Sequence, residues 1–207
     1  MASGKFIALE GGEGVGKSTQ ARRLAERLRG QGLDVLQTRE PGGSAGAEVI
    51  RGLLLDPAQS WGPRAEALLF AAARADHVAQ LIRPALESGH WVLCDRFVHS
   101  SLAYQGHALA LGTDAVAALH AFGSEDLMPD RILLLHADPD ACAERLRLRD
   151  GDKGDRIGAR DEDFHHRVRE GFEALAARDP ERIRPVDASG SLDEVAARVW
   201  AEVEPLI

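Results

Sequence analysis

The segment from Gly11 to Ser18 carries residue types that could bind and activate phosphate groups. It reads Gly-Gly-Glu-Gly-Val-Gly-Lys-Ser and fits the pattern G-x-x-x-x-G-K-[ST]. Glycines let successive backbone N–H groups turn toward one anion, and a helix N-terminus adds the positive end of its dipole. Lys17 could reach the outer phosphates of a nucleotide, and the Ser18 hydroxyl could hold Mg²⁺. The pattern predicts a nucleoside triphosphate site; the alternative is a glycine-rich turn without a ligand.

A loop of this kind belongs between a strand and a helix, and the flanking sequence predicts both. The apolar run at 6–9 predicts a buried strand just before the loop. After the loop, apolar residues recur at the helical spacing i, i+3, i+4 and i+7, at Ala21, Leu24, Ala25 and Leu28. Gly30 and Gly32 offer stops for that helix.

Strand and helix patterns alternate along the rest of the chain. Apolar runs at 33–36, 91–94, 132–135 and, more weakly, 183–186 predict further strands, and helical spacing recurs over 64–88. Asp138-Pro139 is typical of a helix cap followed by proline, and predicts a helix to about 149. Ser191 and Glu194 have capping-box spacing before a last helix. We therefore expect one three-layer α/β domain over 1–207, with a five-stranded parallel sheet and helices on both faces.

Length and composition narrow the class of protein. The 207 residues are 44% hydrophobic and 28% charged, which is ordinary for a globular domain. The net charge of −8 argues against a general binder of nucleic acid or anionic membranes, which needs a basic surface. We find no apolar stretch approaching 18 residues and no signal-peptide pattern, so we expect no membrane span and a cytoplasmic location. The two cysteines cannot form a disulfide framework.

The segment 148–163 interrupts the alternation of strands and helices. It contains Asp-Gly-Asp-Lys-Gly-Asp followed by Arg156 and Arg160, with almost no apolar residues. One interpretation is a solvated surface loop, and the other is a mobile, arginine-rich lid over the phosphate site. The chain has no asparagine, and its lysines at 5, 17 and 153 do not form the N/T-K-x-D element with which GTPases recognise guanine. A small kinase therefore fits the chain better than a switch.

Charged residues at the ends of two predicted strands could bind a second substrate. Asp95-Arg96 follows the run at 91–94, and Arg39 follows the second strand. Ligands of open α/β sheets bind beyond the carboxyl ends of the strands, where an arginine could clamp a phosphate. A strand-end ion pair and a surface turn fit these patterns equally well. Phe70 and Arg74 share a helical face and could bind a base, or could be a core ring beside a solvent-facing arginine.

Five motifs in this order together resemble the thymidylate kinase family. They are Gly-Gly-Glu-Gly-Val-Gly-Lys-Ser-Thr at 11–19, Thr-Arg-Glu-Pro-Gly-Gly at 38–43, Ile-Arg-Gly-Leu-Leu-Leu at 50–55, Leu-Leu-Phe-Ala-Ala-Ala-Arg at 68–74 and Asp-Arg-Phe-x-x-Ser-Ser-Leu-Ala-Tyr-Gln-Gly at 95–106. The resemblance runs from residue 6 to about 203. It implies a P-loop NTPase fold, phosphoryl transfer from ATP to dTMP with Mg²⁺, small-molecule substrates rather than nucleic acid, and a homodimer.

The resemblance also assigns the donor side and the acceptor phosphate. ATP would be bound by Gly11, Gly12, Glu13, Gly14, Val15, Gly16, Lys17, Ser18 and Thr19. Ser18 and Asp95 would hold the metal, and Glu13 would approach the sugar 3′-hydroxyl of the acceptor. Arg39 and Arg96 would contact the acceptor phosphate, and Arg51 matches a further arginine on that side.

The nucleoside of the acceptor would meet a second set of residues. The resemblance implies that Phe70 stacks on thymine and that Arg74 bonds its carbonyl, with Ser101 and Gln105 near the base. Tyr104 would pack under the sugar, where a ribose 2′-hydroxyl would clash.

Members of the family carry a catalytic arginine either in the phosphate loop or on the lid. Positions 12–15 hold no basic residue, so the chain resembles the lid type, with Arg149 as the best match and Arg145 or Arg156 as alternatives. Two segments depart from the family pattern. His-Ala-Leu-Ala-Leu-Gly at 107–112 replaces a stretch that usually has glycines and an arginine, and His136 stands near a strand end that is usually Leu-Asp. We expect His136 to be a packed strand-end residue rather than a catalyst.

Overall fold

The computed structural model describes residues 4–150 and 155–207, without the side chains of residues 149 and 150. Its sheet has five parallel strands: β1 (Phe6–Glu10), β2 (Val35–Arg39), β3 (Trp91–Asp95), β4 (Arg131–His136) and β5 (Ile183–Asp187). The strand order is β2-β3-β1-β4-β5, so β1 lies at the centre and delivers the loop that follows it to the middle of the sheet edge. The predicted parallel α/β sheet is confirmed.

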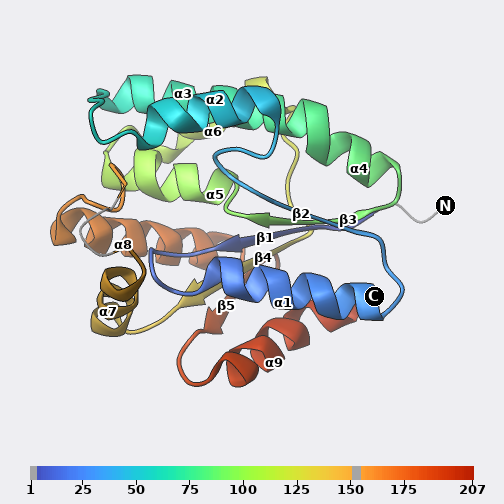
Figure 1. The fold of residues 1–207 in the computed structure, drawn as a ribbon. Coiled ribbons are helices and arrows are strands. Elements are labelled where there is room, and N and C mark those ends of the chain that lie inside the picture. The colour runs from blue at the N-terminus through green and yellow to red at the C-terminus, as the bar shows by residue number, and fades with distance from the viewer. Residues whose placement is uncertain (1–3, 151–154) are drawn as a thin grey trace.

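Helices cover both faces of this sheet (Figure 1). One face carries α1 (Lys17–Gly30) and α9 (Leu192–Val203), which is followed by a short 3₁₀ turn at Glu204–Leu206. The other face carries α3 (Pro63–His77), α4 (Arg83–Glu87), α5 (Val98–Ser101), α6 (Thr113–Ser124) and α8 (Glu162–Arg178). The remaining helices are α2 (Ala45–Leu55), which packs on α3, and α7 (Pro139–Asp150).

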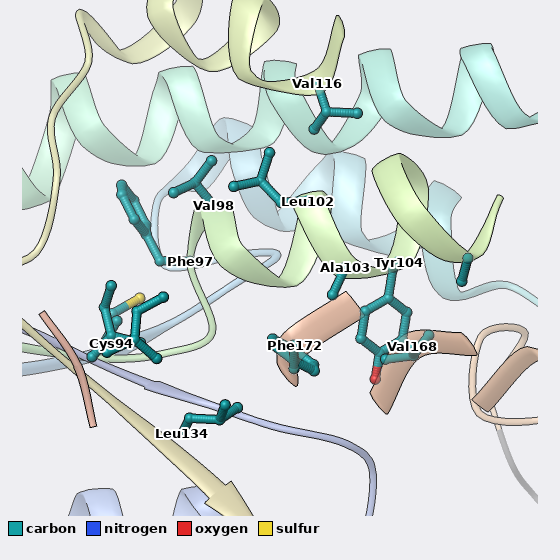
Figure 2. Close-up of a cluster of buried hydrophobic side chains, with 14 of the residues drawn as sticks. Cys94, Phe97, Val98, Leu102, Ala103, Tyr104, Val116, Leu134, Val168 and Phe172 are labelled. Carbon is teal, nitrogen blue, oxygen red and sulfur yellow. The ribbon is translucent and has the colours of Figure 1, made fainter. Parts of the chain in front are cut away.

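Alternation along the strands gives the sheet two separate cores. Ile7, Leu9 and Leu93 point toward α1 and α9, whereas Phe6 and Ala8 point toward the larger layer. Figure 2 shows this second core, in which Phe97, Tyr104 and Phe172 lie among aliphatic side chains from β3, β4, α6 and α8. Burial on both faces fixes the register of each strand, so the strand ends and their loops are held in place.

The helix predicted over 64–88 is helical throughout 63–87, but it is not one regular α-helix. A π-helical turn at Val78–Ile82 separates α3 from α4. Pro84 has no N–H to donate to the preceding turn, and an irregular turn accommodates the missing hydrogen bond. The two predicted caps are confirmed: Asp138 accepts a hydrogen bond from the Ala141 N–H, and Ser191 and Glu194 form a capping box.

The predicted lid segment, 148–163, is partly helical at both ends, because α7 runs to Asp150 and α8 begins at Glu162. Residues 151–154 lie outside the described part of the chain. In the part that follows, Ile157 is buried in the larger core and Arg156 donates to the backbone of α2. These two side chains are docked on the protein, whereas Asp155, Gly158 and Ala159 are exposed.

The two departures from the family pattern take different forms. In the stretch 107–112, Ala108 ends a π-helical segment (Leu102–Ala108) and is buried in the larger core, and Leu109 and Leu111 pack against that core. His136 ends β4 as expected, but the expected packing is wrong because its side chain is exposed. Its register partner Asp187 is the last residue of the edge strand β5, so His136 lies at the limit of the covered sheet. Within the described ranges, no helix is both long and apolar enough to cross a bilayer.

Candidate active site

A cavity of about 740 Å³ opens at the carboxyl ends of the central strands. The predicted site residues that line it come from six separate segments: Glu13, Gly14, Val15, Gly16, Lys17, Ser18, Thr19, Arg39, Arg51, Phe70, Arg74, Asp95, Arg96, Ser101, Tyr104, Gln105 and the alternative Arg145. Gly11 and Gly12 instead line a neighbouring hollow between α7 and α8. The side chain of Arg149 lies outside the described residues. One cavity therefore receives both the phosphate loop and the predicted acceptor residues.

The phosphate loop connects β1 to α1 and depends on glycine at positions where no side chain fits. Gly14 has a φ of 73°, and a Cβ there would lie 2.4 Å from the carbonyl oxygen of Cys142. Lys17 begins α1, and its Nζ donates hydrogen bonds to the carbonyl oxygens of Gly11 at 3.1 Å and Gly12 at 2.6 Å. Burial, followed by the charge of Arg96, lowers the pKa of Lys17 to about 8. This ammonium group is held in a place where an anion would stabilise its charge.

Ser18 and Asp95 place two oxygen atoms side by side. The Ser18 hydroxyl, from the first turn of α1, donates to Asp95 Oδ2 at 2.5 Å. Asp95 is the last residue of β3, and it is paired in register with Leu9, the residue before the end of β1. The parallel register of β1 and β3 thus brings a loop hydroxyl and a strand-end carboxylate together, and such oxygen donors suit Mg²⁺.

Arg96 lies at the centre of the acceptor side of the cavity. Its φ of 72° is in the left-handed region, which non-glycine residues rarely adopt. Its Nη2 donates to Glu13 Oε1 at 2.6 Å and to the Tyr104 hydroxyl at 3.3 Å. Its Nη1 donates to the Gly11 carbonyl at 3.0 Å and to Ser100 Oγ at 2.9 Å. Burial alone would raise the pKa of Glu13, but Arg96 and then Lys17 lower it to about 2, so Glu13 is a carboxylate.

Glu10 holds the turn that carries Arg96, and sequence reasoning missed it. Its side chain is fully buried, and one oxygen accepts hydrogen bonds from the N–H groups of Phe97 at 2.8 Å and Ser100 at 3.1 Å. The other oxygen accepts from Ser100 Oγ at 2.6 Å. Burial raises the pKa of Glu10. An acidic residue that ends an otherwise apolar strand is the signal that could have identified it.

Arg39 and Arg51 flank the cavity on the β2 side. Arg39 ends β2, and its guanidinium is 2.9 Å from Glu48 on α2. Arg51, also on α2, donates to the Pro41 carbonyl at 2.6 Å. The structure thus places both arginines at the cavity wall, with internal partners that an incoming anion could replace.

Arg74 is buried, so the solvent-facing alternative for it is wrong. Its Nε donates to Glu40 Oε2 at 2.7 Å, and its Nη2 donates to Ser101 Oγ at 2.9 Å. Phe70, one turn earlier on α3, is half-buried and lines the cavity. Glu40, which the sequence did not single out, also accepts from His77 at 3.1 Å. This buried carboxylate fixes the orientation of the guanidinium that faces the cavity.

The comparisons with known proteins agree with this geometry. The family model described as thymidylate kinase matches residues 9–199. The chain belongs to the thymidylate kinase family. The thymidylate kinase of Rhizorhabdus wittichii is 58% identical over 205 residues, which is 99% of both chains, and that of Nitrobacter winogradskyi is 48% identical over 96% of this chain and 87% of its own. The crystal structure of thymidylate kinase from Ehrlichia chaffeensis superposes with a TM-score of 0.80 at 29% identity, with both chains fully covered.

Membership of the thymidylate kinase family accounts for the P-loop fold and for the order of the five motifs. The matched region contains every segment that lines the cavity. The chain is therefore an ATP-dependent nucleotide kinase of this family.

Proposed function

We propose that this chain is a thymidylate kinase, which transfers the γ-phosphate of ATP to dTMP and releases dTDP and ADP. The observation that carries the proposal is the shared cavity, which Lys17 enters from the donor side and Arg39 and Arg96 enter from the acceptor side. Two polyanions repel one another, and cations between them reduce that repulsion. Phosphoryl transfer needs this positioning and charge neutralisation more than covalent help from the protein.

On the donor side, the phosphate loop would bind the triphosphate of ATP. The buried ammonium of Lys17 would exchange the carbonyl oxygens of Gly11 and Gly12 for phosphate oxygens. Ser18 and Asp95 would hold Mg²⁺, which when bound neutralises charge on the phosphates. Their two oxygen donors fit that ion by chemistry and by their proximity.

On the acceptor side, Arg96 would hold the phosphate of dTMP, and the Glu13 carboxylate would accept a hydrogen bond from the sugar 3′-hydroxyl. Both side chains already line the cavity, and Arg96 donates a hydrogen bond to Glu13. The attacking atom is a phosphate oxygen, which needs no strong general base. Phe70 would stack on the thymine ring, and Arg74 would donate to a ring carbonyl, with Ser101 and Gln105 beside it. Tyr104 would lie under the sugar.

The catalytic arginine is proposed to be Arg149, near the end of α7. Arg145 lies one helical turn earlier and lines the cavity, which supports a role for this helix. Arg156 is engaged elsewhere, since its Nη2 donates to the buried Glu66 at 2.8 Å. A cation supplied to the transferring phosphoryl group is worth ~10³–10⁵ in rate in related enzymes.

We also propose a homodimer built on the outer layer of α2, α3 and α6 (Figure 1). Large apolar side chains are exposed on these helices: Val49, Leu53, Leu68 and Phe122. Phe122 is 92% exposed, which is costly for a ring of that size unless a second copy covers it. We further propose a cytoplasmic location for this reaction between ATP and dTMP.

The deciding experiment measures ADP release with ATP and Mg²⁺, comparing dTMP, dUMP, UMP, dGMP and AMP as acceptors. We expect a strong preference for dTMP that Lys17→Ala abolishes. Preference for another monophosphate would overturn the assignment of the base pocket. ATP binding without acceptor-dependent turnover would instead indicate a regulatory nucleotide-binding module.

A further inference from the structure

A third buried carboxylate, Glu66 on α3, lies behind the acceptor pocket and contacts it through Gln105. Glu66 has no exposed surface and lies one helical turn before Phe70 and two before Arg74. It accepts hydrogen bonds from side chains on two distant segments of the chain. The roles proposed above for the reacting groups do not use it.

One oxygen of Glu66 is held by two guanidinium groups. Oε2 accepts from Arg156 Nη2 at 2.8 Å and from Arg160 Nη2 at 2.5 Å. Arg156 is itself fixed, because its Nε donates to the Leu54 carbonyl at 2.8 Å, and Arg160 lies over the Phe164 ring at 4.4 Å. Both arginine side chains are mostly buried, with 12% and 19% exposure, so the carboxylate is restrained from this side.

The other oxygen of Glu66 sets the orientation of Gln105. Gln105 Nε2 donates to Glu66 Oε1 at 2.9 Å, and Gln105 lines the cavity. A carboxylate can only accept hydrogen bonds, so the amide must turn its NH₂ group toward Glu66. The amide then has its acceptor, Oε1, left for a ligand.

We propose that Glu66 is a positioning residue for base selection. Arg156 and Arg160 hold Glu66 in place, and Glu66 holds the amide of Gln105. Gln105 Oε1 then faces the pocket, where it can accept a hydrogen bond from the ring N3 of the base. Thymine carries a hydrogen on N3, whereas cytosine has a lone pair there and would be repelled. The inference deepens the proposed function and rests on it, because it places the base beside Gln105.

The test compares kcat/KM for dTMP with kcat/KM for dCMP in wild type and in Glu66→Gln. An amide at position 66 can accept or donate, so Gln105 could adopt either orientation. We expect the dTMP-to-dCMP ratio to fall about tenfold, the scale on which one misdirected hydrogen bond discriminates. Asp76→Asn is the matched control, because Asp76 lies on the same helix but accepts from Ser44 and Ala47, and the ratio should not change.

A double-mutant cycle that combines Glu66→Gln with Gln105→Met separates an effect through Gln105 from a general loss of activity. If Glu66 acts through Gln105, Glu66→Gln has no further effect on the ratio once the amide is gone. Equal losses for both nucleotides, or the same fall in the Gln105→Met background, would overturn the inference and leave the proposed function standing. A wild-type chain that phosphorylates neither nucleotide would overturn both.

Arg160→Met provides a second measurement that does not depend on the stability of Glu66→Gln. It removes one donor from Glu66 Oε2 and leaves the contact with Gln105 in place. We expect the ratio to fall about threefold, since the carboxylate loses part of its restraint. An unchanged ratio would contradict the role of the arginines.

Discussion

Glu13 and Arg96 form a 2.6 Å ion pair inside the nucleotide cavity. They come from the loops after β1 and β3, which the parallel sheet brings together. The Tyr104 hydroxyl lies 3.3 Å from both. The groups proposed to bind the sugar and the phosphate of the acceptor are thus paired with each other, and an acceptor phosphate must compete with Glu13 for the guanidinium.

Arg96→Lys tests whether the planar guanidinium of Arg96, with its two donor nitrogens, is required. Lysine keeps the charge but cannot contact Glu13, Gly11 and Ser100 in the same plane. We expect the KM for dTMP to rise about tenfold or more, with a smaller change in the KM for ATP. Steady-state ADP release measures both constants. Arg83→Lys, which does not line the cavity, should match wild type, and an unchanged KM for dTMP in Arg96→Lys would contradict the proposed phosphate contact.

The pKa of Lys17, lowered to about 8, predicts that ATP binding weakens in alkaline solution. Above that pH the ligand-free protein loses the proton that the triphosphate needs, so affinity should fall by up to about tenfold per pH unit. ATP titrations between pH 7 and pH 9.5 measure this. Lys17→Arg keeps its charge throughout this range and should show weaker but pH-independent binding. A flat wild-type profile would show that Lys17 does not titrate there.

Asp95→Asn tests the proposed magnesium site. The substitution removes the charge next to the Ser18 hydroxyl and keeps the side-chain shape. We expect the half-saturating Mg²⁺ concentration to rise about tenfold, because a neutral amide binds this ion more weakly than a carboxylate. Activity measured against free Mg²⁺ gives this value. The control is Asp130→Asn, whose carboxylate pairs with Lys5 away from the cavity, and equal half-saturation in the two variants would refute the site.

Tyr104→Phe tests discrimination against ribose. The hydroxyl is buried against Glu13 and Arg96, where the sugar of the acceptor is proposed to lie. Its removal leaves space for a 2′-hydroxyl, so we expect the preference for dUMP over UMP to fall about tenfold. Competing kcat/KM values for the two nucleotides measure it. The same preference in both proteins would place the sugar elsewhere.

Arg149→Ala tests the assignment of the catalytic arginine. We expect kcat to fall at least about 10²-fold with little change in either KM, since the lost charge acts on the transferring group. Arg147→Ala is the matched control, because Arg147 is exposed and pairs with Glu144 on the same helix. Unchanged turnover in Arg149→Ala would move the assignment to Arg145 or Arg156.

The sequence alone determined the elements and the donor site. Strands, caps and the phosphate loop depend on neighbours a few residues apart, so their patterns are visible without the fold. The same holds for Arg39, Asp95 and Arg96, because residues at the carboxyl ends of parallel strands must meet at one edge. The parallel sheet and the shared cavity followed from these local signals.

The tertiary structure alone decided how the acceptor residues are oriented. Glu10, Glu40 and Glu66 reach partners 87, 34 and 90 residues away in Phe97, Arg74 and Arg156. The sequence pattern around a single carboxylate in an apolar stretch does not indicate which distant residue it contacts. Burial makes such a group costly unless donors surround it, and only the packed fold supplies those donors. Local sequence motifs were therefore enough to identify the site, whereas the orientation of its side chains depends on long-range contacts.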